Sequence, residues 1–215
     1  MPLTEVQMNR LILFFSQPPQ TSDTVLGGRG SIIHDRIDDL GPVVIKRYIR
    51  GGLLGRLIRR SYIRLGKSRS QLEFELLQRA RELGINVPEP LVCASRGSLI
   101  YRAWLVTREI ESALPLARLS SDDENRTRRV MEAVIDQISR LIEHRIMHVD
   151  LHPGNVLVDG QNRVHLVDFD KGKFQRGDAN TLRNRYLNRW QRAVKKHGLP
   201  PVLNEMLQEG LLEPR

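Results

Sequence analysis

The chain has 215 residues, with 34 Lys and Arg against 25 Asp and Glu, which gives a formal charge of +9. Hydrophobic residues make up 40% and charged residues 27%, so a fibrous or wholly disordered chain is excluded and one domain or two small lobes are expected. The single cysteine, Cys93, excludes a disulfide framework and a zinc site built from cysteines.

The first predicted elements in chain order are two strands. Residues 11–15 and 41–48 are apolar and bounded by turn formers, and a glycine-rich turn at residues 27–31 lies between them. The run at 11–15 is also the longest apolar stretch. It is far shorter than the ~20 residues that span a bilayer and too short for a secretory signal, so we expect a cytosolic protein.

The middle of the chain predicts one helix and further strand. Apolar residues recur at three- and four-residue spacing over residues 68–83, and Gly84 follows as a C-cap, so a helix is expected there. The two prolines of residues 86–90 require an extended backbone. Residues 99–107 have the composition of one or two strands.

The second half of the chain is predicted to be mostly helical. A helix is expected over residues 122–143, after N-capping and acidic residues. Residues 156–158 and 164–167 then form a predicted hairpin, and residues 180–197 form a last amphipathic helix. Strands with one helix, followed by helices around a hairpin, indicate a two-lobed α+β protein with a cleft between the lobes.

The strongest chemical signal is an aspartate and an asparagine five residues apart, Asp150 and Asn155, followed after the hairpin by Asp168. This order is typical of the catalytic loop and metal-binding element of kinases. We assign Asp150 as the catalytic base, and Asn155 and Asp168 as ligands of Mg²⁺, which prefers hard oxygen ligands. Either piece alone could be turn or capping chemistry, but the two in register favour a kinase.

Two histidines, His148 and His152, flank Asp150. A zinc site is not favoured, because no HExxH helix or further spaced ligand accompanies them. We expect His148 to pack and hydrogen-bond so that it fixes the loop.

Upstream, Lys46 ends a predicted strand after the glycine-rich turn. Kinases place at this point the lysine that pairs with the α- and β-phosphates of ATP. The next helix carries Glu73 and Glu75, either of which could hold Lys46, and the motif context favours Glu73.

Other nucleotide contacts are predicted from position. The turn with Gly28 and Gly30 departs from the full G-x-G-x-x-G pattern, so an ordinary turn remains an alternative to a phosphate-covering loop. Glu109 lies where the hinge between the lobes is expected, and the backbone there would meet adenine.

The complete prediction is a protein-kinase-like two-lobed fold. Residues 1–110 form a small β-rich N-lobe with one helix, and residues 111–215 form a reduced, mostly helical C-lobe.

The sequence resembles the lipopolysaccharide kinase family, and within it the kinases of 3-deoxy-D-manno-octulosonic acid (Kdo) of Gram-negative bacteria. The resemblance spans about residues 27–171 and is carried by residues 28–30, 46–53, 73–77 and 87–90, the Asp150 loop and residues 168–171. It implies ATP-dependent phosphorylation of the 4-hydroxyl of Kdo on a lipid A precursor at the cytoplasmic face of the inner membrane, with Asp150 in the active site. An Ala-Pro-Glu element after Asp168 is missing, and residues 172–178 leave little room for a protein substrate, so a small-molecule acceptor is indicated.

Residues 46–69 hold nine Lys or Arg and no Asp or Glu, interleaved with apolar residues. A solvated helix face is one interpretation. The amphipathic pattern favours peripheral contact with an anionic membrane surface, which attracts each nearby cation by about 1 kcal/mol.

Two other function classes remain open. The basic last helix could make the protein a kinase-like nucleic-acid-binding module, but aromatic residues are only 5% of the chain, so no nucleic-acid partner is expected. The Asp150 loop is also shared with phosphotransferases of the aminoglycoside or choline type, which differ in their acceptor.

Overall fold

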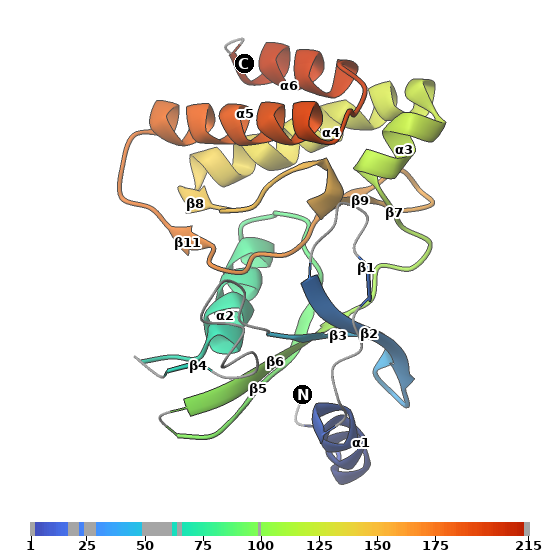
Figure 1. Ribbon diagram of the computed structural model, residues 1–215, viewed down its shortest axis with the longest axis vertical. Coiled ribbons are helices and arrows are strands. Elements are labelled where there is room, and N and C mark those ends of the chain that lie inside the picture. Colours follow the sequence, from blue (N-terminus) through green and yellow to red (C-terminus); the bar gives the residue numbers. More distant parts are fainter. Residues whose placement is uncertain are drawn as a thin grey trace. The chain divides into compact units, whose positions relative to one another are not determined.

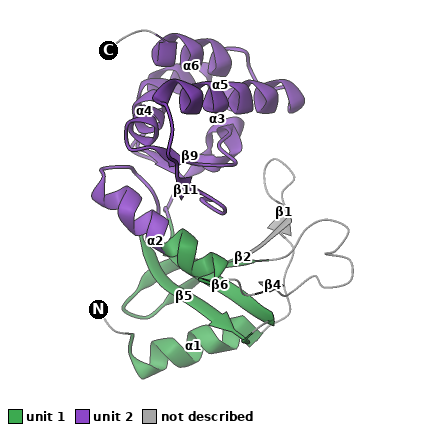
Figure 2. Ribbon diagram, turned by 90° about the vertical axis from the view of Figure 1, so that its left-hand side faces the viewer, with its two compact units in different colours: residues 1–74, 89–109 green, residues 75–88, 110–215 purple. Residues whose placement is uncertain are grey.

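The structure is a computed structural model that describes residues 3–16, 22–23, 29–48, 62–63, 66–98 and 100–212 (Figure 1). It divides into two compact units, which are residues 1–74 with 89–109 and residues 75–88 with 110–215 (Figure 2). Helices and strands occur in both units, so the protein is α+β. None of the helices over the described residues combines the length and apolar character needed to cross a membrane.

The first unit is built on an antiparallel sheet. Its strands have the order β1-β2-β3-β6-β4, with β5 paired to the other edge of β6. The bounds are β1 (Ser22–Asp23), β2 (Arg29–Ile37), β3 (Gly41–Arg47), β4 (Tyr62–Ile63), β5 (Pro90–Arg96) and β6 (Ile100–Arg108). The predicted strands at 41–48 and 99–107 are confirmed as β3 and β6. Strands β2 and β5 were not predicted, although β2 supplies the long partner of β3.

The predicted strand at residues 11–15 is wrong, because these residues belong to helix α1 (Glu5–Ser16). Thr4 and Gln7 form a capping box: the Gln7 amide donates to Thr4 Oγ1 at 3.3 Å, and the Thr4 amide donates to Gln7 Oε1 at 3.0 Å. Leu11 is buried in the core of the sheet, and the ring of Phe15 stacks on Trp104 with centroids 4.9 Å apart. The packing of Leu11 and Phe15 from one face of a helix therefore determines the structure of this segment, rather than its run of five apolar residues.

The predicted helix at 68–83 is confirmed as α2 (Arg69–Glu82). Ser68 Oγ accepts the Gln71 amide at 3.2 Å, and Gly84 takes a left-handed φ of 73° after the helix end. The predicted glycine-rich turn is corrected in part: Gly30 lies in β2, opposite Ser22 of β1, where backbone pairing extends the strand. Gly28 lies outside the described residues.

The second unit is mostly helical. Its helices are α3 (Leu116–Asp122), α4 (Glu124–Glu143), α5 (Ala179–Lys196) and α6 (Val202–Leu212), and α5 and α6 both lie against α4 (Figure 1). The predicted helices at 122–143 and 180–197 are confirmed as α4 and α5, while α3 and α6 were not predicted. Asp123 caps α4 by accepting the Arg126 amide at 2.8 Å, and the helix begins at Glu124, two residues later than expected.

Two small sheets complete this unit, with the strand orders β10-β9-β7 and β11-β8. Their bounds are β7 (Leu114–Pro115), β8 (Ile146–Met147), β9 (Val156–Val158), β10 (Val164–Leu166) and β11 (Lys173–Phe174). The predicted hairpin is confirmed as β9 and β10.

Residues 75–88 group with this unit, because the Asn86 amide donates to Gln137 Oε1 of α4 at 2.6 Å and the Asn86 carbonyl accepts the Leu166 amide at 2.8 Å.

A buried carboxylate organises the turn between β9 and β10. Asp159 is 3% exposed, and its Oδ1 accepts the amides of Gln161 and Arg163 at 2.9 Å each. Its Oδ2 accepts Arg163 Nε at 2.7 Å and contacts His165 Nε2 at 3.3 Å. Burial alone would raise the pKa of Asp159, but the hydrogen bonds from Arg163, Gln161 and His165 outweigh it and lower the pKa to about 2.

Candidate active site

The segment that carries Asp150 follows β8 and is held by a buried tyrosine of α5. The Tyr186 hydroxyl donates to the Ile146 carbonyl at 2.6 Å and accepts the His148 amide at 2.9 Å. Tyr186 is 2% exposed, and its burial raises the pKa of its hydroxyl, so the hydroxyl stays protonated and can donate. Helix α5 therefore fixes the start of the loop.

His148 links this loop to the segment around Asp168. The side chain is 1% exposed, and its Nε2–H donates to the Val167 carbonyl at 2.9 Å. Its ring lies against that of Phe169, with centroids 4.4 Å apart and planes tilted by 59°. His148 thus packs and hydrogen-bonds as expected. Within the described part of the chain, no group of three or more His, Cys, Asp or Glu is arranged to hold a metal ion.

Asn155 connects the two halves of the predicted site. Its Nδ2 donates to the Asp150 carbonyl at 2.9 Å, and its backbone carbonyl accepts the Val167 amide at 3.0 Å. The first bond closes the loop over five residues, and the second ties the loop to the residue before Asp168. Because the amide nitrogen of Asn155 is used on the loop, its Oδ1 is the atom left to bind a cation.

Asp168 has a backbone φ of 64°, in the left-handed region that most L-residues avoid. Aspartate tolerates this conformation better than bulkier residues do. Its neighbours are both fixed, since Val167 is bonded to Asn155 and Phe169 is fully buried. Such backbone conformations cost about 1–3 kcal/mol, so the fixed neighbours must hold Asp168 in this conformation.

Asp150 itself pairs with an arginine of α5. Arg189 Nη2 contacts Asp150 Oδ1, and the two side chains are 41% and 46% exposed. The sequence analysis counted Arg189 only among the basic residues of the last helix. No local spacing could have paired it with Asp150, because 39 residues separate them and only the packing of α5 beside the loop brings them together.

His152 caps the short 3₁₀ helix η2 (Pro153–Asn155), and its Nδ1 accepts the Gly154 amide at 3.1 Å. Burial lowers the pKa of His152, and the nearby His197 and Lys196 add to this effect, while Asp168 opposes it. His152 is therefore a neutral residue that shapes the loop.

In the first unit, the expected pairing of Lys46 with Glu73 is present. Lys46 Nζ lies 3.0 Å from Glu73 Oε1 and 2.9 Å from Oε2. The Glu73 side chain is only 4% exposed, and it also accepts a hydrogen bond from the Tyr48 hydroxyl. The ammonium lies 5.1 Å from the centroid of the Tyr48 ring. Two partners therefore hold the buried carboxylate that positions Lys46.

Glu109 is fixed within the same unit. Its Oε1 lies 2.7 Å from His34 Nδ1, and its amide donates to the Pro42 carbonyl at 3.0 Å. The amide of the preceding Arg108 is likewise used, by the Glu89 carbonyl at 2.9 Å. A nucleotide contact at Glu109 would therefore use its backbone carbonyl rather than its amide or side chain.

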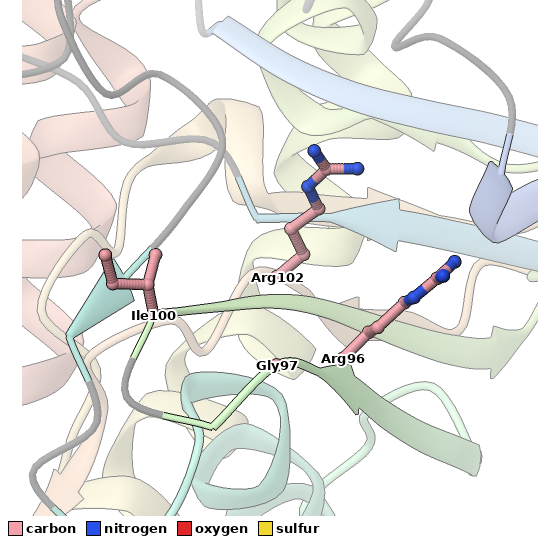
Figure 3. Close-up of a pocket in the computed structure, with 4 residues that line it drawn as sticks. All are labelled: Arg96, Gly97, Ile100 and Arg102. Carbon is pink, nitrogen blue, oxygen red and sulfur yellow. The ribbon is translucent and has the colours of Figure 1, made fainter.

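A pocket with a volume of about 380 Å³ lies where β5 and β6 meet (Figure 3). It is lined by Arg96, Gly97, Ile100 and Arg102. Arg96 and Arg102 are cross-strand partners, so two like charges face each other there. None of the predicted site residues that the structure describes lines this pocket.

Comparison with known proteins agrees with the motifs. A model of the lipopolysaccharide kinase (Kdo/WaaP) family matches residues 29–208. The 3-deoxy-D-manno-octulosonic acid kinase of Photobacterium profundum is 36% identical over 161 residues, which are 73% of this chain and 67% of that protein. The kinase of the same description from Vibrio cholerae serotype O1 is 32% identical over 167 residues (76% and 70%), and that from Vibrio vulnificus (strain CMCP6) is 31% identical over 197 residues (89% and 82%).

Proposed function

The chain belongs to the lipopolysaccharide kinase family, and we propose that it transfers a phosphoryl group from ATP to the 4-hydroxyl of Kdo on a lipid A precursor. The observation that carries the proposal is the bonding of Asn155. Its side chain holds the Asp150 loop and its backbone holds the segment of Asp168, so the base and both metal-ligand candidates belong to one hydrogen-bonded unit. Family membership favours this kinase function over a nucleic-acid-binding module.

In the proposed reaction, the Asp150 carboxylate accepts the proton of the acceptor hydroxyl. The hydroxyl oxygen forms a bond to the γ-phosphorus, the bond from that phosphorus to the β–γ bridging oxygen breaks, and ADP leaves. Asn155 Oδ1 and the Asp168 carboxylate fit Mg²⁺, which prefers oxygen ligands and keeps several waters or phosphate oxygens of its own. Mg²⁺ held there would neutralise charge on the phosphates.

Lys46 would bind the α- and β-phosphates, with Glu73 holding its ammonium in place. Gly28 and Gly30 would cover the phosphates, and the backbone at Glu109 would meet adenine. These roles assign the first unit as the N-lobe and the second as the C-lobe of a protein-kinase-like fold, with the sequence-based boundary near residue 110.

The acceptor is lipid-linked in this proposal, so we also propose peripheral association with the cytoplasmic face of the inner membrane. The basic stretch at residues 46–69 supports it, although residues 49–61, 64 and 65 lie outside the described part of the chain. Sedimentation with vesicles of anionic and of neutral lipid tests the idea. We expect salt-sensitive binding to the anionic vesicles, and equal, salt-insensitive partitioning would refute it.

Mass analysis of products from a panel of Kdo-containing and other sugar acceptors tests the reaction itself. We expect the Kdo-linked lipid A precursor to gain one phosphate, at the 4-hydroxyl by fragmentation. Asp150→Asn should lower turnover about 10²- to 10⁴-fold. Asp122→Asn is a matched control, since Asp122 is exposed on α3 and pairs only loosely with Arg118 at 3.6 Å. A product only with aminoglycoside or choline acceptors would overturn the assignment of Kdo.

A further inference from the structure

The pairing of Arg189 with Asp150 leaves the carboxylate partly open. Asp150 Oδ1 is covered, so the 46% exposure of the side chain belongs to its other edge, including Oδ2. Arg189 is itself 41% exposed. A guanidinium has five N–H donors in a planar fork, and one contact to Oδ1 leaves most of them available.

Positive charge is in excess on this helix. Helix α5 contains six Lys or Arg and no Asp or Glu. Three of its other arginines bond to neutral oxygens rather than to carboxylates: Arg183 to Asn180, Arg185 to Gln175 and Arg192 to Asn188. Partial burial lowers the pKa of Arg189, and the charge of Arg192 lowers it further. The two guanidinium groups are therefore close enough to repel each other.

The charge of α5 reaches the Asp150 loop. Lys196, at the end of α5, acts on His152, which lies between Asp150 and Asn155 in the chain, and Asp168 opposes it there. Asp150 and Asp168 carry two negative charges against the six Lys or Arg of α5, so positive charge remains in excess. Such an arrangement attracts a further anion.

We propose that Arg189 binds the carboxylate of the acceptor sugar acid, which takes the place of Asp150 as the partner of the guanidinium. The inference rests on the proposed function, because Kdo is an acid and its carboxylate matches the fork of Arg189 in a bidentate pair. The exchange releases Asp150 Oδ1 to accept the proton of the acceptor hydroxyl. A neutral sugar would leave Asp150 Oδ1 bound to Arg189, so the same residue that recognises the acceptor also frees the second oxygen of the base.

The test compares two acceptors, the Kdo-linked lipid A precursor and its Kdo methyl ester, which keeps the lipid phosphates but lacks the carboxylate charge. For the unmodified protein, kcat/KM should be about 10- to 100-fold higher with the acid, as expected for a hydrogen-bonded charge pair. In Arg189→Met this preference should fall to less than about threefold, while the KM for ATP stays unchanged; Arg189→Lys should retain part of it. Arg185→Gln, an exposed change on the same helix, is the control and should keep the full preference.

Asp150→Asn provides a second readout that does not require turnover. Because it removes the carboxylate that competes for Arg189, it should bind free Kdo at least as tightly as the unmodified protein in calorimetry, whereas Arg189→Met should bind more weakly. Thermal unfolding of each variant checks that it folds.

The outcomes separate the two proposals. A full preference for the acid in folded Arg189→Met would overturn the role of Arg189 and leave the kinase assignment intact. Loss of activity on both acceptors by the same factor would overturn it too, and would indicate that Arg189 acts only through Asp150. If the unmodified protein phosphorylates neither acceptor, the proposed function fails, and the inference fails with it.

Discussion

Replacing Tyr186 with phenylalanine removes one oxygen atom from the interior of the second unit. That oxygen is the partner of two main-chain groups, the Ile146 carbonyl at 2.6 Å and the His148 amide at 2.9 Å. The ring would keep its packing, because Tyr186 is 2% exposed and phenylalanine has nearly the same shape. The substitution therefore isolates the hydrogen bonds that hold the Asp150 loop to α5.

The expected cost follows from the two groups left without a partner. A buried donor or acceptor that loses its partner costs about 1–3 kcal/mol, so the loss of two such bonds in Tyr186→Phe should lower the free energy of unfolding by about 2–6 kcal/mol. Activity should fall as well, because the His148 amide begins the segment that orients Asp150. The KM for ATP should change less than kcat.

Hydrogen exchange of the second unit measures this cost directly. We expect the His148 amide to exchange markedly faster in Tyr186→Phe. The amides of α4 should lose protection by an amount equal to the loss in the free energy of global unfolding. Tyr101→Phe is the matched control, because the Tyr101 hydroxyl accepts one amide, that of Arg69 at 3.1 Å, and lies in the first unit. A change below about 0.5 kcal/mol in Tyr186→Phe, with unaltered exchange at His148, would refute the reasoning.

Two further predictions concern the second unit. The pKa of Asp159 is about 2 in the folded protein against 3.8 ordinarily, so it stabilises the fold above about pH 3.8, and this stabilisation is lost as the pH falls from 3.8 toward 2. Asp159→Asn should therefore lower the free energy of urea unfolding by about 2 kcal/mol at pH 7 and by little at pH 2, and an equal loss at both would contradict this. A Cβ on Gly172 would lie 2.6 Å from Leu76 Cδ2 and 2.8 Å from the Phe169 carbonyl oxygen, whereas on Gly160 it would meet nothing closer than 4.0 Å. Gly172→Ala should destabilise by about 1–3 kcal/mol in thermal unfolding and Gly160→Ala should be tolerated; similar melting temperatures for the two would show that the backbone after Asp168 yields.

Sequence patterns predicted elements well where local signals agreed. Helix α4 combines an N-cap with a long apolar period, and the hairpin β9–β10 has a turn whose side chains bond to their own backbone. Helix α1 was missed because five consecutive apolar residues suggest a strand, while the Thr4–Gln7 capping box that starts the helix is a weaker signal. Short elements such as α3 and α6 depend on packing against α4, which no local pattern expresses.

By itself, the amino-acid sequence determined the order and spacing of Asp150, Asn155 and Asp168. A tight loop followed by a short hairpin brings its own two ends together, so Asn155 bonds both to the start of the loop and to the residue before Asp168. It also placed Glu73 on the helix that faces Lys46. The folded chain alone decided that α5 lies beside the loop, where Tyr186 bonds across 40 residues and Arg189 pairs with Asp150. Contacts at that separation arise from helix packing in a shared core, and a side chain's partner there depends on which faces of two distant helices are buried.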